Sequence, residues 1–264
     1  MKQKYGFTNM RVTLNENLTL TRIVALTDFG NIKSGTVGGY IQATGNLSQD
    51  GLCWVADSAY VFGLARITGD ATVCGNAVVC DRACVTDRAI IRDRAILNDH
   101  TFAYGDVEIG ASSFVSGATT VYGNARIFCE SNGGRCRLPN VRGLARIMEN
   151  AVLLDRGTVS ERAVLRDHAV LRGNARLSGD AVATGHSLLD GSARVTDNAY
   201  VTGFAELSGR TLVCNHAAVF GRCKVSGRSI ITGNAKLAGR GSYHGIRLGG
   251  NDVCGLTYLL RRVS

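Results

Sequence analysis

A repeat of six residues is the feature that most constrains how this chain can fold. Residues 65–70, Ala-Arg-Ile-Thr-Gly-Asp, are one of 29 such hexads. The third residue of the hexad is Val, Ile or Leu in 27 of them, and the residue two places earlier is Ala, Ser, Thr or Cys in 27. The residue two places later is Gly or Asp in 24. A strict period of six does not fit the 3.6-residue turn of an α-helix, so the repeat predicts strands.

Each hexad is predicted to form a short strand followed by a turn. A small residue and a branched residue two places apart point to the same face of an extended segment. Glycine or aspartate two places further on suits a left-handed backbone conformation, so the chain turns there. All hexads run in the same direction with the same inward pattern, which favours parallel stacking of coils over an antiparallel meander.

This pattern resembles the hexapeptide-repeat proteins, whose fold is a single-stranded left-handed parallel β-helix. In that family, three hexads make one triangular coil of 18 residues, so 29 hexads correspond to about ten coils. The handedness is an implication of the resemblance alone, because the general preference for right-handed crossovers points the other way. The expected fold class is therefore all-β, with a cap at each end of the β-helix.

The chain is expected to contain three regions. Residues 1–52 lack the period and are interpreted as an N-terminal cap, residues 53–240 as the β-helix, and residues 241–264 as a C-terminal cap. The segments Ala25 to Ile41 and Asn46 to Val55 resemble the start of the YdcK-like hexapeptide-repeat proteins. That resemblance implies architecture, and it implies no particular reaction.

The repeat is interrupted at residues 128–146. Ile127 and Ile147 are 20 residues apart, which we interpret as one coil with an insertion of two residues. Interruptions of a repeat are common places for function. We therefore expect a basic loop that binds an anionic ligand, and a tolerated bulge is the alternative. The candidate ligand-binding residues are Arg135, Arg137 and Arg142.

Apolar residues recur once per predicted coil at one outward-facing position. If the insertion stays within one coil, seven of them form a continuous stripe, which a monomer rarely leaves open to water. The stripe predicts a homo-oligomer interface, and the family resemblance implies a trimer with parallel axes. The alternative is that neighbouring arginines cover the stripe. The seven residues are Tyr60, Val78, Ile96, Phe114, Val152, Val170 and Leu188.

The formal charge of the chain is +9, with 25 arginines and 5 lysines. This excess favours an anionic partner. Several arginines directly follow an acid, as Arg88 follows Asp87, so we expect solvated edge charges with partial pairing. The sequence does not favour a nucleic-acid partner, because it contains neither a dedicated binding motif nor interleaved aromatic residues.

Two histidines are the candidate catalytic residues. His168 and His186 are separated by three hexads, so they are expected to stack in adjacent coils, where two imidazoles disfavour double protonation. Many hexapeptide-repeat proteins are acyltransferases that use a histidine base, and this resemblance suggests the role. The alternative is that both are ordinary corner residues. The sequence contains no metal-ligand cluster, phosphate-binding loop or nucleophile elbow, so no metal and no cofactor are expected.

The leading interpretation is a non-catalytic, oligomeric β-helix scaffold or binding protein of the YdcK-like type. The alternative is an acyl-CoA-dependent acyltransferase, similar to acetyltransferases, which acts on a sugar or amino acceptor; only in that case is acyl-CoA a cofactor. No apolar run reaches the ~20 residues of a membrane helix, and residues 1–29 contain no secretory apolar core. We therefore expect no membrane association and a cytoplasmic location.

Overall fold

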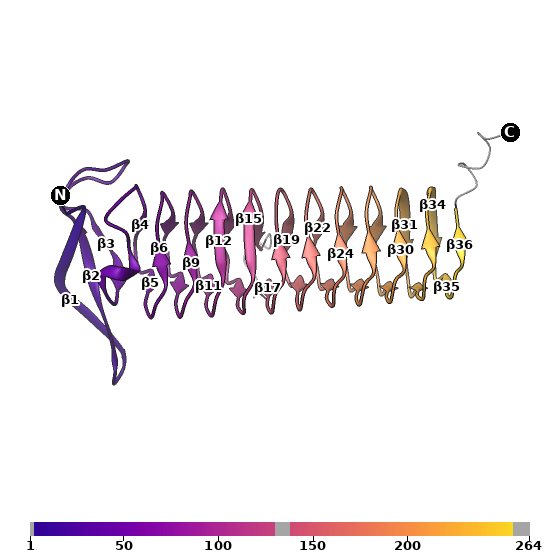
Figure 1. Ribbon diagram of the computed structural model, residues 1–264, viewed down its shortest axis with the longest axis horizontal. Coiled ribbons are helices and arrows are strands. Elements are labelled where there is room, and N and C mark those ends of the chain that lie inside the picture. Colours follow the sequence, from indigo (N-terminus) through magenta and orange to yellow (C-terminus); the bar gives the residue numbers. More distant parts are fainter. Residues whose placement is uncertain (1–2, 130–137, 256–264) are drawn as a thin grey trace. The chain divides into compact units, whose positions relative to one another are not determined.

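The computed structural model describes residues 3–129 and 138–255. The chain divides into two compact units, Met1–Asn124 and Ala125–Ser264. In both units short strands follow one another with turns between them (Figure 1). In the described residues the helical content is limited to one 3-10 turn, η1 (Thr44–Asn46).

Unit 1 begins with three strands that precede the coils, and the first two of them are longer than a hexad allows. They are β1 (Tyr5–Asn15), β2 (Leu18–Ala25) and β3 (Val37–Ile41). β1 pairs antiparallel with β2, and β2 pairs antiparallel with β3. β3 then pairs in parallel with the first coil, where Tyr40 lies opposite Tyr60. An antiparallel layer therefore leads directly into the parallel coils.

The rest of unit 1 consists of four coils, and each coil contributes one strand to each of three parallel sheets. The sheet that β3 joins contains β5 (Tyr60–Val61), β8 (Val78–Val79), β11 (Ile96–Leu97) and β14 (Phe114–Val115). The second sheet contains β4 (Trp54–Val55), β7 (Thr72–Val73), β10 (Ile90–Ile91) and β13 (Glu108–Ile109). The third sheet contains β6 (Arg66–Ile67), β9 (Cys84–Val85), β12 (Phe102–Gly105) and β15 (Thr120–Gly123).

Unit 2 repeats the arrangement over seven coils in its described residues. One sheet contains β17 (Asn140–Val141), β20 (Thr158–Val159), β23 (Arg176–Leu177), β26 (Arg194–Val195), β29 (Leu212–Val213), β32 (Ile230–Ile231) and β35 (Arg247–Leu248). Another contains β16 (Arg126–Phe128), β19 (Val152–Leu154), β22 (Val170–Leu171), β25 (Leu188–Leu189), β28 (Glu206–Leu207), β31 (Arg222–Ser226) and β34 (Arg240–His244). The third contains β18 (Arg146–Ile147), β21 (Val164–Leu165), β24 (Val182–Ala183), β27 (Tyr200–Val201), β30 (Ala218–Val219), β33 (Lys236–Leu237) and β36 (Val253–Cys254).

The register of the sheets confirms the predicted parallel coils. In unit 1, Ile96 pairs in parallel with Val78 on one side and with Phe114 on the other, one predicted coil away in each direction. In unit 2, Val170 pairs in the same way with Val152 and Leu188. Each unit is thus a stretch of parallel β-helix of the hexapeptide type.

The interior of each coil is filled by the two inward columns of the hexad. Branched residues such as Val79 and Leu171 and small residues such as Ala77 and Ala169 are 0% exposed. Where the small residue carries a hydroxyl, this group can donate to the carbonyl three residues earlier. The hydroxyl of Ser113, for example, lies 2.6 Å from the carbonyl oxygen of Gly110. The narrow interior is therefore packed. Thr101 and Thr211 have the same kind of backbone partner as Ser113, whereas the buried hydroxyl of Ser187 has no partner in the described residues.

The turn column adopts the left-handed conformation that the sequence predicts. Gly75 has a φ of 68° and Asp87 a φ of 57°. Residues that are neither glycine nor aspartate follow the same rule, as Glu161 has a φ of 63° and Asn215 a φ of 61°. The conformation is thus fixed by the coil geometry, and glycine is the residue that adopts it with least strain.

The interruption is longer than predicted. Ile127 pairs with Leu153 in the next coil, and Leu153 pairs with Leu171 in the one after it. The first of these two steps along the chain is longer than the second by eight residues, so the insertion has eight residues and the prediction of two is wrong. A further strand, β17, lies within the range 128–146 that was expected to be irregular. Its hexad was missed because the buried Pro139 occupies the position of the small residue.

The coils also extend beyond Arg240, where a cap was expected to begin. β34, β35 and β36 pair in parallel with β31, β32 and β33. Leu248 lies opposite Ile231, so this coil is one residue shorter than a coil of three full hexads. With this coil and the hexad of β17, the described residues form eleven coils instead of the expected ten.

Candidate functional site

The outward side of β5, β8, β11 and β14 is the most apolar face of unit 1. Its two outward positions per coil carry no charged side chain in the described coils. Ile96 is 37% exposed although its neighbour Leu97 is 0% exposed. The ring of Tyr60 also contacts Tyr40 of β3, with centroids 5.5 Å apart. We call this surface the apolar face, and its residues are Tyr60, Phe62, Val78, Cys80, Ile96 and Phe114.

The predicted stripe does not continue into unit 2. Val152, Val170 and Leu188 stack on one another, but Val152 pairs with Arg126 of β16. Arg126 follows Phe114 by two hexads, whereas three hexads separate neighbours in one column. The prediction of one seven-residue line is therefore wrong, because the insertion of eight residues shifts the register. The four residues of unit 1 form the part that remains, and their role as an interface stays a prediction.

The two candidate histidines stack as predicted. The rings of His168 and His186 have centroids 4.7 Å apart and are 20° from parallel. The column continues beyond His186, with Phe204 stacked on this ring at 4.8 Å and the guanidinium of Arg222 5.0 Å from the Phe204 ring. Both imidazoles are exposed at a corner of the coil. The spacing of one full coil between His186 and Phe204 could have revealed this extension.

The two rings of the imidazole column are open to solvent, and few polar groups surround them. The side-chain amide of Asn150 lies 3.4 Å from Nε2 of His168. Two carboxyl groups lie beside the column at the turn position. Hydrogen bonds from Glu149, Thr184 and the amide of Gly185 lower the pKa of Asp167, and the hydrogen bond with Asp167 raises the pKa of Glu149.

Acids at the turn position have a structural task that the sequence analysis missed. The carboxylate of Asp87 accepts a hydrogen bond of 2.9 Å from the amide of Gly105, one coil further on. Glu161 does the same for Gly179, and Asp197 for Asn215. These carboxylates bind the backbone of the next coil. The signal was present in the sequence, because each acid lies three hexads before another turn residue.

The arginines divide into paired and unpaired groups. Arg88 makes two hydrogen bonds of 2.6 Å to Asp106, and Arg162 makes an equivalent pair with Asp180. Both pairs are exposed, so each contributes little to stability. They join adjacent coils rather than neighbours in sequence, so the expected partial pairing exists but with different partners.

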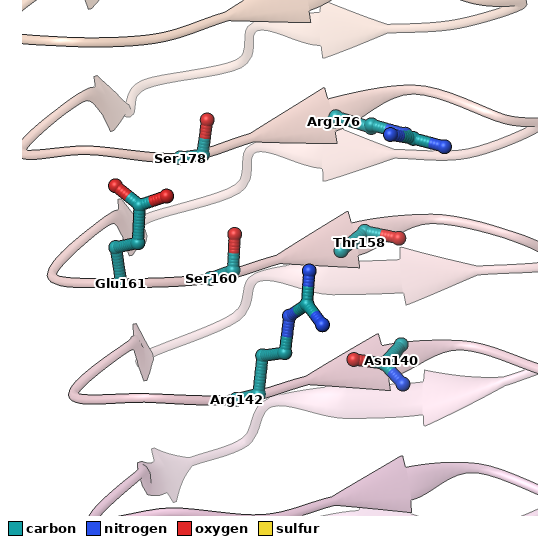
Figure 2. Close-up of a pocket in the computed structure, with 7 residues that line it drawn as sticks. All are labelled: Asn140, Arg142, Thr158, Ser160, Glu161, Arg176 and Ser178. Carbon is teal, nitrogen blue, oxygen red and sulfur yellow. The ribbon is translucent and has the colours of Figure 1, made fainter.

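Arg135 and Arg137 of the predicted basic loop lie outside the described residues. Arg142 is described, and it directly follows β17 instead of belonging to the loop. Its side chain points toward the next coil, beside Ser160 and Thr158 (Figure 2). These residues line a shallow groove of about 400 Å³ together with Asn140, Glu161, Arg176 and Ser178.

Other chemistry receives little support from the described residues. No group of three or more His, Cys, Asp or Glu in residues 3–129 and 138–255 could hold a metal ion. Burial raises the pKa of the Cys80 thiol to about 12, and burial also raises the pKa of Cys53, Cys74 and Cys223. These thiols therefore stay protonated near neutral pH and are poor nucleophiles. In the same part of the chain, no helix has the length and apolar character needed to cross a membrane.

Fold and repeat together define a hexapeptide-repeat β-helix protein, and comparisons with known proteins add one partial sequence match. A stretch of 68 residues is 34% identical to the protein named uncharacterized acetyltransferase YdcK of Escherichia coli (strain K12). The match covers 25% of this chain and 21% of that protein, so this chain spans about a fifth of its relative's length. No family model matches the sequence.

Among solved structures, the chain matches UDP-N-acetylglucosamine O-acyltransferase (LpxA) from Moraxella catarrhalis RH4. The match has a TM-score of 0.23 and 11% identity, and it covers 75% of this chain and 66% of that chain. The assignment of the fold therefore depends on the hexads and on the register of the sheets in this chain.

Proposed function

We propose that this protein is a non-catalytic β-helix scaffold that self-associates and binds a partner. The observation that carries the proposal is the apolar face of unit 1, with Ile96 37% exposed at its centre. A row of apolar side chains on consecutive coils lowers its free energy when a second copy removes it from water. Parallel trimers are the assembly that the resemblance to hexapeptide-repeat proteins suggests, and the cytoplasm stays the expected location.

The chain offers a matched pair of residues for the test. Ile90 occupies the same hexad position as Ile96, is 41% exposed and lies in β10, in a different sheet. Ile96→Lys places a charge in the proposed interface, whereas Ile90→Lys places the same charge outside it. Sedimentation velocity at micromolar concentration is expected to show oligomers for the wild type and Ile90→Lys, and monomers for Ile96→Lys.

Circular dichroism separates a lost interface from a lost fold. All three proteins should give the same β-sheet spectrum, because the side chain at each position projects outward from an intact coil. A wild-type protein that is monomeric at every concentration would contradict the proposal. Equal dissociation of both variants would show that the apolar face is not the interface.

A second candidate function is acyl transfer from acyl-CoA. Two observations favour it, namely the stacked pair His168 and His186 and the partial similarity to a protein named as an acetyltransferase. An exposed imidazole can act as a general base when an acceptor hydroxyl or amine lies within hydrogen-bonding reach. This function is placed second because both imidazoles are exposed at a corner of the coil.

Thermal-shift measurements with coenzyme A and acetyl-CoA discriminate the two functions. A ligand present at about 100 times its Kd stabilises a protein by about 2.7 kcal/mol, which is readily detected. The scaffold proposal expects no shift and no release of coenzyme A when sugars or amines are added. A shift that disappears in His168→Ala or His186→Ala would favour the transferase.

A further inference from the structure

The excess positive charge of the chain belongs to unit 2. Residues 1–124 contain 10 Lys and Arg and 11 Asp and Glu, a net charge of −1. Residues 125–264 contain 20 Lys and Arg and 10 Asp and Glu, a net charge of +10, and the two values give the +9 of the whole sequence. A partner attracted by charge would therefore bind unit 2.

Five exposed arginines of unit 2 surround the outward side of β17, β20, β23, β26, β29 and β32. Arg176 and Arg194 lie opposite each other in the paired strands β23 and β26. In the described part of the chain, none of the five has a carboxylate within ion-pair distance, in contrast to Arg162 with its partner Asp180. We call this surface the arginine face, and its arginines are Arg142, Arg176, Arg194, Arg210 and Arg228.

Two shallow grooves lie on the arginine face. The first is the groove in Figure 2, where the single described acid, Glu161, already accepts a hydrogen bond of 2.9 Å from the amide of Gly179. The second has a volume of about 660 Å³, and its described lining contains no acid. Hydroxyl, amide and apolar side chains lie among its arginines. The lining residues are Asn174, Ser192, Arg194, Arg210, Thr211, Leu212, Arg228 and Ile230.

The arrangement suits an extended ligand. The five arginines are distributed over six consecutive coils, which corresponds to about 24 Å at ~4.8 Å per coil. A small anion would contact one or two of these side chains, whereas a linear polyanion would contact all of them. Guanidinium groups pair with carboxylate and sulfate oxygens through two parallel hydrogen bonds.

The other lining residues decide between classes of polyanion. Single-stranded nucleic acids bind with their bases stacked on aromatic rings, and the described linings of both grooves contain no aromatic residue. Short hydroxyl and amide side chains such as Ser160, Ser192 and Asn174 can bond sugar hydroxyls, while Leu212 and Ile230 offer small apolar surfaces for sugar rings. We propose that the arginine face binds an acidic polysaccharide, whose sugars carry carboxylate or sulfate groups. This inference rests on the binding role proposed above and names the chemistry of the partner.

Fluorescence anisotropy with labelled polysaccharides of equal length tests the proposal. The probes are polygalacturonate for carboxylate, dextran sulfate for sulfate, dextran as the neutral control, and a single-stranded oligonucleotide. We expect at least one acidic polysaccharide to bind, dextran not to bind, and affinity to fall between about 50 and about 200 mM salt, as counterion release requires. The two acidic probes show which anionic group is preferred.

A matched pair of triple variants locates the site. Arg176→Ser/Arg194→Ser/Arg228→Ser removes three cations from the arginine face. Arg146→Ser/Lys236→Ser/Arg240→Ser removes three cations from the other two sheets of unit 2. We expect the first variant to bind at least about tenfold more weakly and the second to stay within about threefold of the wild type. Equal losses in both variants, tighter binding of the oligonucleotide, or no binding of either acidic probe would overturn the proposal.

The same variants keep this proposal separate from self-association. Sedimentation of the arginine-face variant should match that of the wild type, because the apolar face of unit 1 is unchanged. If polysaccharide binding fails while Ile96→Lys still dissociates the oligomer, the scaffold stands and the assignment of its partner is wrong.

Discussion

The carboxylate of Asp87 is expected to stabilise the coil that follows it, and three substitutions can separate this effect from backbone strain. Asp87 has a φ of 57°, in the left-handed region, and its Oδ2 lies 2.9 Å from the amide nitrogen of Gly105. The residue thus combines an unfavourable backbone conformation with a favourable hydrogen bond. Alanine removes the hydrogen bond and keeps the strain, whereas glycine removes both.

The magnitudes follow from these two effects. A hydrogen bond to a charged acceptor contributes about 1.5–3 kcal/mol, and the lower end applies because Asp87 is exposed. A Cβ atom in the left-handed region costs about 1–2 kcal/mol, and glycine removes this strain. About 0.5–1 kcal/mol of that gain is offset, because glycine also raises the conformational entropy of the unfolded chain. Asp87→Ala should therefore destabilise by about 1.5 kcal/mol and Asp87→Gly by about 0.5–1 kcal/mol. Asp87→Asn, which keeps an acceptor oxygen, should cost the least.

Amide hydrogen exchange at Gly105 is the most direct assay, because it reports on the bond itself. A loss of about 1.4 kcal/mol corresponds to tenfold faster exchange, so we expect about a tenfold effect for Asp87→Ala if local opening governs exchange. Amides in distant coils should be unaffected. Unchanged exchange at Gly105 in Asp87→Ala, or a larger effect for glycine than for alanine, would refute the reasoning.

Three further predictions concern single residues. Gly179→Ala should lower the free energy of unfolding in urea by at least about 2 kcal/mol, because φ is +72° and the new Cβ would lie 2.6 Å from the amide nitrogen of Asp197. Gly45→Ala is the control: its Cβ would meet no atom within 4 Å, so the free energy of unfolding should change by under about 0.5 kcal/mol. Burial raises the pKa of Tyr5 to about 12, so the stability that its neutral phenol contributes is intact below pH 10 and is lost as the pH rises toward 12. This loss amounts to up to about 2.7 kcal/mol, and Tyr5→Phe should abolish it. The measurement compares the free energy of unfolding against pH for the wild type and the variant. The Cys80 thiol, with its pKa raised to about 12 by burial, should react with iodoacetamide at pH 8 at least about a hundredfold more slowly in the native protein than in urea, and comparable rates would contradict its assigned burial.

The sequence predicted the local fold well because the repeat makes each environment a function of position. Whether a residue is buried, turns the chain or projects outward depends on its place in the hexad, and its neighbours lie one coil before it and one coil after it. The stacking of His168 on His186 followed from this rule alone. The hydrogen bonds that Asp87 and Glu161 accept from the next coil obey the same rule. They were missed because both Gly and Asp suit the turn position, so the presence of an acid there needed no further explanation.

Errors arose where the period changes, because a repeat specifies position only relative to the previous coil. The spacing between Ile127 and Ile147 is compatible with two added residues or with eight added residues and one hexad fewer. Val141 and Gly143 fit the hexad columns, but Pro139 stands where a small residue was expected, and this concealed the hexad. One unrecognised hexad was enough to place Val152 on the wrong face.

Because the place of a residue in the hexad decides whether it is buried, the interiors of the two units are alike. The apolar face of unit 1 and the arginine face of unit 2 nevertheless differ in chemistry. Inward positions are constrained by the narrow coil, so Val79 in unit 1 and Leu171 in unit 2 are equally buried. Outward positions are free of that constraint, and neither fold nor stability requires Ile96 to be apolar or Arg194 to be basic. When acids are occupied with backbone amides of the next coil, arginines on a flat sheet face remain without partners. Consecutive coils carry apolar outward residues in unit 1, and the paired strands β23 and β26 carry Arg176 and Arg194 in unit 2. These residues are best explained by what the two faces bind, so substitutions there should alter association while leaving the coils intact.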